Sequence, residues 1–154
     1  MAADKWIIYD TFKERIGDGT IDLDADVFKI QLHTSTHVPS RTADTARADL
    51  SNELATANGY TAGGATLASV TWVEATGTIT FDSADPSWTA SGGSLTARFA
   101  VIYDDTPTTP VVDPLLGYSL LDNAPADVTV TDGNTLTIQI NASGIFTLAG
   151  GETA

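Results

Sequence analysis

Cysteine is absent from this chain of 154 residues, and so are long apolar runs. Without cysteine there are no disulfides and no thiolate metal sites, so stability has to come from packing or from assembly. No apolar stretch approaches the roughly 20 residues that a membrane-spanning helix requires. The N-terminus does not place a long apolar run after a basic start, so we expect no secretory signal there and no membrane partner.

Positive charge is nearly missing from the last two thirds of the chain. Residues 48–154 contain 12 acidic residues and one basic residue, Arg98, whereas residues 1–47 contain 8 acidic and 6 basic residues, and the formal net charge is −13. Binding to DNA or RNA needs Lys and Arg to displace counterions from phosphate, so this charge excludes a nucleic-acid partner. The same charge keeps free copies soluble and apart until a specific contact overcomes the repulsion.

Residues that could carry catalysis form no recognisable set. There is no Gly-x-Ser-x-Gly motif, and only two histidines are present to act as a base. A carboxylate pair for glycoside hydrolysis stays open among the 20 acidic residues, because acids distant in sequence can meet in space. An acidic surface also supplies such pairs by coincidence. We therefore predict a protein that is not an enzyme, with no catalytic residues and no cofactor.

Three aspartates at alternate positions, Asp22, Asp24 and Asp26, resemble the start of a calcium-binding EF-hand loop. That loop needs Gly at its sixth position and Glu at its twelfth, where this chain has Val27 and His33. We therefore favour a solvated turn that leads into a strand and predict no metal site, with calcium kept as the alternative.

The two histidines, His33 and His37, are four residues apart, a spacing that binds zinc on a helix. Thr34 occupies the position where a zinc protease has its glutamate, and Pro39 makes the segment a poor helix. On a strand the two side chains would lie about 13 Å apart, at roughly 3.3 Å per residue, too far for one metal ion. We predict two surface histidines, on a strand and on the loop that follows.

Glycines at positions 59, 63 and 64 form a stretch that might be read as a phosphate cradle. It has no P-loop lysine, and no basic residue follows until Arg98. We interpret it as a tight turn between a helix and a strand. Arg98 itself, as the one cation of an acidic region, is expected either to pair with a carboxylate, within the subunit or across an interface, or to be an exposed strand charge.

The tryptophans Trp6, Trp72 and Trp88 allow two interpretations. They could form a platform on which a sugar stacks. More often such residues belong to the core or anchor a protein interface, and we favour this second interpretation.

The pattern of apolar residues predicts one domain over residues 1–154 that is mainly β. A helix is expected over about residues 4–16, where Ile8, Phe12 and Ile16 share a face, with Asp4 as N-cap and Gly17 just past its end. A second, short and weak helix is expected over residues 44–57, with an ordered loop as the alternative because its apolar stripe is thin. In residues 27–34, Phe28, Ile30 and Leu32 alternate with Lys29, Gln31 and His33, which predicts a half-buried strand.

From Tyr60 onward, strand-forming residues are broken by Gly, Asp, Asn and Pro. We expect hairpins at residues 74–77 and at residues 131–134, where Asp-Gly fits a type I′ turn. The resulting β-rich body, about residues 20–148, is predicted to be an antiparallel β-sandwich or a jelly-roll-like sheet. The expected strands cover residues 66–74, 78–82, 95–103, 115–121, 127–131, 136–141 and 144–148.

Six segments in order along the chain resemble a family of small virion structural proteins of tailed bacteriophages. The likeness extends from about residue 6 to residue 148, and its segments are residues 18–24, 27–35, 58–67, 97–103, 114–118 and 137–148. The resemblance implies a β-rich, oligomeric, non-enzymatic building block, with a capsid decoration (cement) protein as one form. It assigns no functional residue to this chain.

The leading hypothesis is therefore a virion protein, made in the host bacterial cytoplasm, that clamps neighbouring major capsid subunits and forms a homotrimer. Trp6 and Ile7 in the N-terminal helix are the expected docking element, and removal of residues 1–17 is expected to abolish assembly while the β-domain stays folded. The alternative is a tail, collar or fibre-associated protein with receptor or glycan contact through Trp88 and the loop of residues 104–114. A hydrolase with paired carboxylates is the third hypothesis.

Overall fold

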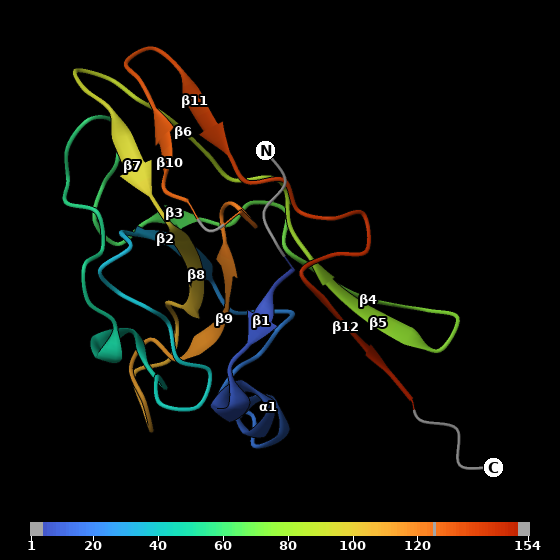
Figure 1. The fold of residues 1–154 in the computed structure, drawn as a ribbon. Coiled ribbons are helices and arrows are strands. Elements are labelled where there is room, and N and C mark those ends of the chain that lie inside the picture. Colours follow the sequence, from blue (N-terminus) through green and yellow to red (C-terminus); the bar gives the residue numbers. More distant parts are fainter. Residues whose placement is uncertain (1–4, 125, 151–154) are drawn as a thin grey trace.

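The structure, a computed structural model, describes residues 5–124 and 126–150, and it is mainly β, with 37% strand and 8% helix. Every strand pair in these residues is antiparallel, and the arrangement is sandwich-like, in agreement with the predicted fold class (Figure 1). The strands are β1 (Ile7–Ile8), β2 (Phe28–His33), β3 (Ala65–Thr66), β4 (Thr71–Ala75), β5 (Thr78–Asp82), β6 (Ser87–Thr89), β7 (Leu95–Ala97), β8 (Phe99–Asp104), β9 (Leu115–Leu120), β10 (Val128–Val130), β11 (Thr135–Thr137) and β12 (Phe146–Ala149).

A central sheet of five strands, in the order β1-β9-β8-β2-β3, organises the molecule. One face of β2 carries Phe28, Ile30 and Leu32, which are all fully buried. The Phe28 ring lies 5.1 Å from that of Phe81 in β5, in an edge-to-face contact that aromatic pairs prefer. The alternation of apolar residues in β2 therefore identified the face on which the main core forms.

The opposite face of β2 is also buried, which corrects the prediction of a half-exposed strand. Gln31 and His33 are each only 1% exposed. The chain after β2 folds back over this face: the Leu54 N–H donates to the Leu32 carbonyl at 2.9 Å, and Glu53 forms a β-bridge with His33. An irregular segment, residues 34–63, thus covers the side chains that strand alternation assigned to solvent.

The N-terminal helix begins later than predicted. Helix α1 spans Asp10–Gly17, so Gly17 is its last residue and not the first one beyond it. Ile7–Ile8 form strand β1, which pairs with β9, because β-branched side chains favour an extended backbone that here adds a strand to the central sheet. Tyr9 is the N-cap, and Asp4 lies outside the described residues. No helix in the described part of the chain is long and apolar enough to cross a membrane.

The second predicted helix, over residues 44–57, is wrong. Only a single 3₁₀ turn forms there, η1 (Arg47–Asp49). The Asp49 carboxylate accepts hydrogen bonds from the backbone N–H groups of Thr45 and Ala46, at 2.8 and 3.0 Å. Short polar side chains of this kind compete with helical backbone hydrogen bonds and favour turns.

The predicted strands are present, with changed boundaries. Strand β5 matches its prediction, while the predicted strand over 66–74 is divided into β3 and β4, and that over 95–103 is divided into β7 and β8 at Arg98. The short strand β6 was missed. It is three residues long, and its burial alternates around Trp88 alone, which is too brief a pattern to indicate a strand.

One predicted hairpin is confirmed and the other is wrong. Strands β4 and β5 pair across residues 75–78 as expected. The turn at residues 131–134 forms, with the Asn134 N–H donating to the Thr131 carbonyl at 3.0 Å, but β10 pairs with β7 and β11 pairs with β6. A type I′ turn needs positive φ at both central residues, and of these two only Gly133 has it.

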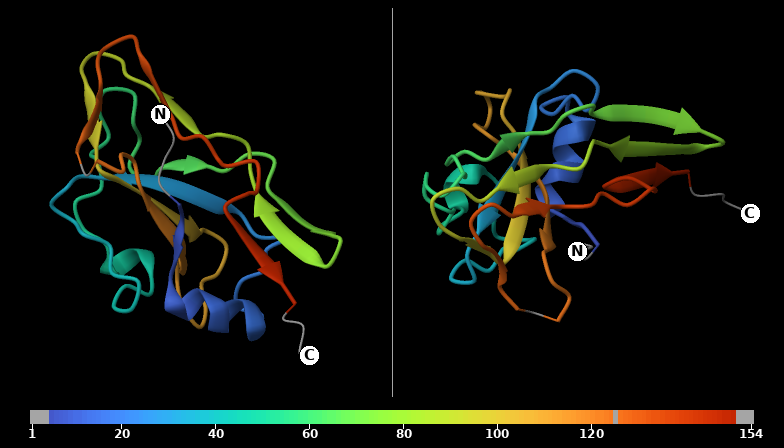
Figure 2. Two further views of the ribbon diagram at one scale, coloured as in Figure 1. Left: turned by 45° about the vertical axis from the view of Figure 1, so that its right-hand side comes forward. Right: turned by 90° about the horizontal axis from the view of Figure 1, so that it is seen from above.

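Three strands form an arm that leaves the body of the molecule, in the order β12-β5-β4. Figures 1 and 2 show this arm projecting away from the central sheet, beyond helix α1. At its root, the Phe146 ring lies 5.4 Å from Phe12 of α1 and 5.4 Å from Phe81. The arm is therefore anchored in the main core while its outer part extends into solvent.

Candidate functional site

The three alternate aspartates lie in one turn, in which their carboxylates accept hydrogen bonds from the backbone of the same segment. The Asp22 N–H donates to the Asp26 carboxylate at 2.7 Å, and the Asp24 N–H donates to the Asp22 carboxylate at 3.1 Å. The residues that the structure describes contain no group of three or more His, Asp or Glu side chains placed to hold a metal ion. The arrangement is that of the solvated turn favoured by the sequence.

The two histidines are neither on the surface nor far apart, so that prediction is wrong. His33 is 1% and His37 is 8% exposed, and their ring centroids are 5.4 Å apart. The estimate of about 13 Å assumed an extended strand through both residues. Strand β2 instead ends at His33, and the chain turns before His37, which brings the second ring back beside the first.

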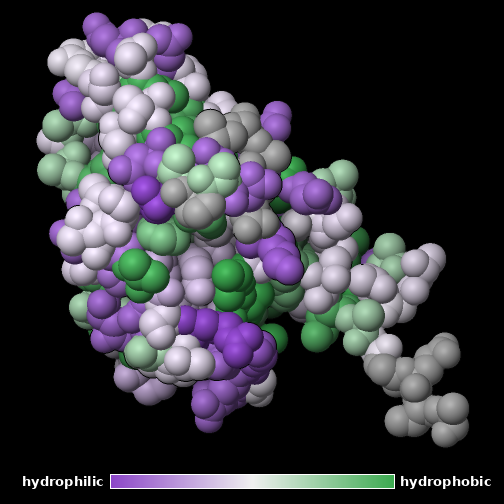
Figure 3. All heavy atoms as spheres, viewed as in Figure 1, coloured by the Kyte–Doolittle hydropathy of each residue, from purple (hydrophilic) through white to green (hydrophobic). Residues whose placement is uncertain are grey.

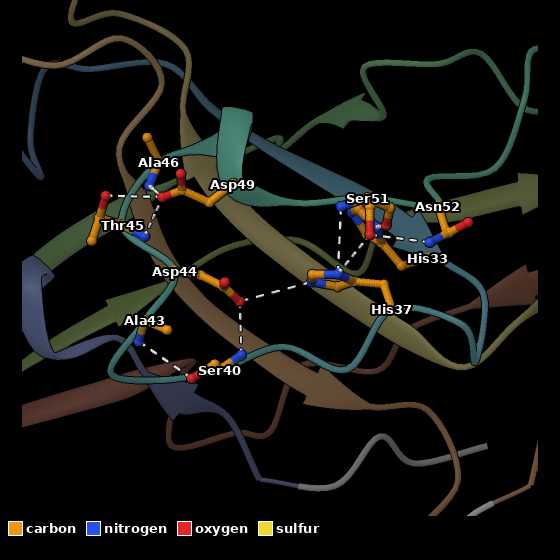
Figure 4. A network of polar contacts seen from close by, with 10 residues as sticks. All are labelled: His33, His37, Ser40, Ala43, Asp44, Thr45, Ala46, Asp49, Ser51 and Asn52. Carbon is orange, nitrogen blue, oxygen red and sulfur yellow. Dashed lines mark hydrogen bonds and ion pairs between the residues drawn. The ribbon is translucent and has the colours of Figure 1, made fainter.

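A network of polar contacts surrounds this histidine pair (Figure 4). The Nδ1 atom of His33 lies 2.9 Å from the Ser51 carbonyl, so it carries the proton and donates. The Nδ1 atom of His37 lies 3.2 Å from the Ser51 hydroxyl oxygen, and the Ser51 N–H donates to it at 3.4 Å. Burial lowers the pKa of His33 from its usual value of 6.5, which favours the neutral ring.

Ser51, His37 and Asp44 place a hydroxyl, an imidazole and a carboxylate side by side, as in a hydrolytic triad, but the distances between them are those of a structural contact. The His37 Nε2 atom lies 3.8 Å from the Asp44 carboxylate, beyond hydrogen-bond range. That carboxylate oxygen instead accepts the Ser40 N–H at 2.7 Å. The network therefore holds residues 34–57 against the sheet, and no motif in the sequence indicated it.

A cavity of about 360 Å³ adjoins this network. Arg47 spans it: its guanidinium lies 5.0 Å from the centre of the Tyr103 ring, 3.4 Å from Asp113 and 3.7 Å from Glu53. No sequence pattern predicted this cavity, because its walls come from three separate segments: β2, the segment that contains η1, and the loop before β9. The lining residues are Gln31, His33, Arg47, Ala48, Leu50, Glu53, Val112 and Asp113.

The tryptophans pack as the favoured interpretation predicts. Trp88 is 6% exposed and its ring lies 6.2 Å from that of Tyr60, so its face is not free to stack on a sugar. Trp72 packs against Phe146 at the root of the arm, with ring centroids 5.9 Å apart. Trp6 is partly buried against the core.

Arg98 forms an ion pair with Asp127, with Nε donating to the carboxylate at 2.7 Å. This contact lies within the subunit, as one of the two interpretations expected. It joins the break between β7 and β8 to the residue before β10, so the cation helps to hold two short strands together.

A buried carboxylate, Asp104, ends strand β8 beside Asp26. It is fully buried, and its Oδ1 atom accepts the Thr106 N–H at 3.0 Å. Burial is the largest cause, and the neighbouring Asp26 a further one, of the rise in the pKa of Asp104 to about 7. Neither residue lines the cavity beside the histidines, so this pair is placed apart from that site.

We expect the Asp104 carboxyl to make stability fall as the pH rises. In the unfolded chain it ionises near 3.8, whereas in the folded protein it holds its proton up to about pH 7. Its contribution is therefore fully present below about pH 4 and is lost as the pH rises through 7. Replacing it by asparagine, Asp104→Asn, should raise the free energy of unfolding at pH 8 by about 1–3 kcal/mol.

Urea unfolding between pH 4 and pH 8 tests this expectation. The free energy of unfolding of Asp104→Asn should change less with pH over that interval than the free energy of unfolding of the wild type. Asp24→Asn, at an exposed position, is the matched control and should keep the wild-type slope. Equal slopes for the wild type and Asp104→Asn would show that the buried carboxyl does not titrate in this window.

An apolar groove of about 560 Å³ separates the arm from helix α1. Figure 3 shows hydrophobic residues at the root of the arm, next to the hydrophilic surface of α1. The groove is mostly apolar although the chain as a whole is strongly acidic. Its lining residues are Lys13, Ile16, Gly17, Gly19, Ile21, Asp22, Leu23, Trp72 and Leu148.

No protein-family model, curated protein or solved structure matches this chain.

Proposed function

We propose that this chain is a non-enzymatic structural protein of a tailed-bacteriophage virion, a capsid decoration protein that bridges major capsid subunits as a homo-oligomer, expected to be a trimer. The likeness of its sequence segments to that family is one support. The observation that carries the proposal is the projecting arm, because it joins exposed apolar residues to free strand edges.

One face of the arm begins with apolar residues in the core and continues into solvent, where Glu74 joins the two apolar residues of the outer row. Strand register places Trp72, Phe81 and Phe146 side by side at the root, and places Leu148 opposite Ile79 two residues further out. Leu148 is 50% exposed. Residues that continue a core outward in this way are typical of a surface that a partner completes.

Within residues 5–124 and 126–150, both outer strands of the arm, β4 and β12, have one edge without a neighbouring strand. Free edges can pair with another chain, and strand addition is a common way in which proteins bind extended segments. In a chain with a net charge of −13, free copies repel one another. An exposed arm on such a chain fits a protein that stays apart in solution and docks on a specific surface.

In this proposal the arm, and not the N-terminal segment, is the main docking element. Ile7 is 37% exposed, but it belongs to β1, an edge strand of the central sheet, and not to a detachable helix. Contacts made by this segment would therefore involve the body of the protein. The arm is the element that can engage a neighbour without changing the core.

We expect Leu148→Asp to weaken binding to phage heads by at least about tenfold, because a charge would enter an apolar contact. The position is half exposed, so the variant should unfold at the wild-type temperature. Val38→Asp, at a position that is 72% exposed and outside the three strands of the arm, is the matched control and should bind like the wild type.

The measurement is co-sedimentation of the purified protein with heads, and separately with tails, of the phage that encodes it. Binding to heads that Leu148→Asp loses supports the proposal. Binding to tails alone would replace it by the tail or collar alternative, and binding to neither would overturn it. A cryo-EM map of the virion would then locate the protein on the particle.

A further inference from the structure

The cavity beside the histidine pair contains two hydrogen-bond acceptors that have no partner among the residues that the structure describes. Gln31 Oε1 and His33 Nε2 are both buried and unpaired. Their side chains point to the same face of β2, because they are two residues apart on a strand, and both line the cavity. A buried polar atom without a partner costs free energy, so a ligand that fills both acceptors would gain from that contact.

Both atoms accept and neither donates. His33 donates its Nδ1 proton to the Ser51 carbonyl at 2.9 Å, so its Nε2 atom carries the lone pair of the neutral ring. Gln31 Oε1 is a carbonyl oxygen. The matching ligand group must therefore carry at least two N–H or O–H donors.

The charge of the cavity favours a cation. Glu53 and Asp113 contribute two negative charges against the single positive charge of Arg47, which leaves a formal charge of −1. Arg47 neutralises only part of this negative charge, because its guanidinium lies 3.7 Å from the Glu53 carboxylate and 3.4 Å from the Asp113 carboxylate. One oxygen of Glu53 also accepts hydrogen bonds from the Tyr60 hydroxyl and the Gly63 N–H, which fixes its carboxylate in place.

The remaining walls are apolar. Leu50 and Val112 line the cavity together with the charged groups. A volume of about 360 Å³ is at the lower end of the roughly 300–1,000 Å³ found for small-molecule sites. The site thus combines vacant acceptors, a net negative charge and contact surface for a short aliphatic chain.

From this geometry we infer that the cavity binds a primary ammonium group on a short aliphatic chain. The ammonium donates to Gln31 Oε1 and His33 Nε2, its charge faces Glu53 and Asp113, and its methylene groups contact Leu50 and Val112. This chemistry occurs both in free alkyl diamines and in a lysine side chain of another protein. The inference does not depend on the proposed function.

Thermal unfolding of the full chain with three probes of similar length tests this inference. 1,4-Diaminobutane stands for the free amine, Nα-acetyl-lysine methylamide for a lysine side chain, and the neutral 1,4-butanediol is the control. A ligand that binds only the folded state raises the unfolding temperature with its concentration. We expect a saturable rise with one or both amines, together with a shift of the His33 Nε2 resonance in ¹⁵N NMR spectra, and neither effect with the diol.

Two variants connect the effect to the cavity. Gln31→Met removes one acceptor at nearly unchanged length and should weaken amine binding about tenfold, whereas Gln139→Met, at an exposed glutamine outside the cavity, is the matched control and should not. Asp113→Asn, on the rim, should weaken binding several-fold and serves as the test if Gln31→Met does not fold. Absence of saturable amine binding, equal binding of the diol, or unchanged affinity in the cavity variants would overturn the inference.

Discussion

Deletion of residues 1–17 should leave a chain without a cooperative unfolding transition. The deletion removes β1 and helix α1, and with them Tyr9 and Phe12, which are 0% and 1% exposed in the core. Truncating one buried aromatic side chain to alanine costs about 3–5 kcal/mol, and a domain has only about 5–15 kcal/mol of stability in total. The loss of two such residues, together with an edge strand, is therefore sufficient to unfold the protein.

Circular dichroism during urea or thermal unfolding checks this result. Deletion of residues 1–4 alone, which keeps β1 and α1, should preserve a sharp transition. If the chain that lacks residues 1–17 also unfolds cooperatively, the N-terminal segment is an accessory element and the core assigned to it is wrong. The sequence predicts that the β-domain survives this deletion, because its apolar pattern indicates a separate N-terminal helix. In the structure, β1 of this segment is instead a strand of the central sheet.

Replacement of Gly64 by alanine should be the most damaging single methyl addition in the described chain. Gly64 has a φ of +78°, and a Cβ atom there would lie 2.0 Å from the carbonyl oxygen of Ile30. That carbonyl belongs to β2, which β8 and β3 hold on both sides, so it has little freedom to move away. We expect Gly64→Ala to cost at least about 4 kcal/mol or to prevent folding.

Comparison with Gly77→Ala separates the cost of the positive φ from the cost of the steric clash at Gly64. Gly77 has a φ of +81°, close to that of Gly64, but apart from its own atoms and those of its chain neighbours no atom of the described residues lies within 4 Å of the position of its Cβ. It should cost only about 1–2 kcal/mol, the penalty of the left-handed conformation. Urea unfolding of both variants gives the difference, and similar losses in the two would show that the approach of the 59–64 turn to β2 is looser than described.

The part of the fold that follows from local pattern was predictable. Alternation in residues 28–33 identified β2, and the hairpin between β4 and β5 followed from its turn residues. The prediction that Gly59 and Gly64 form tight turns was right, since both have positive φ and lie against other backbone segments, but an irregular segment and not a helix precedes them. In each case residues within a few positions of one another decide the conformation.

The part that failed depends on contacts between distant residues. Nothing local to Gln31 or His33 shows that residues 34–63 return over them, because an irregular segment has no periodic pattern. The same is true of the cavity, in which Arg47 meets Glu53 and Asp113 only after three separate segments have folded together. The polar residues on one side of β2 predicted a face exposed to solvent. In the structure, Gln31 and His33 on that face are covered by residues 34–63.

The pairing of β1 with β9 has a consequence for synthesis. Ile7 is opposite Tyr118, so the central sheet cannot close until more than a hundred residues have followed Ile7 out of the ribosome. At roughly 5–20 residues per second, this interval is on the order of 10 s. During that time Ile8, Tyr9 and Phe12 have no sheet to pack on, so the nascent chain is a substrate for chaperones that shield apolar segments.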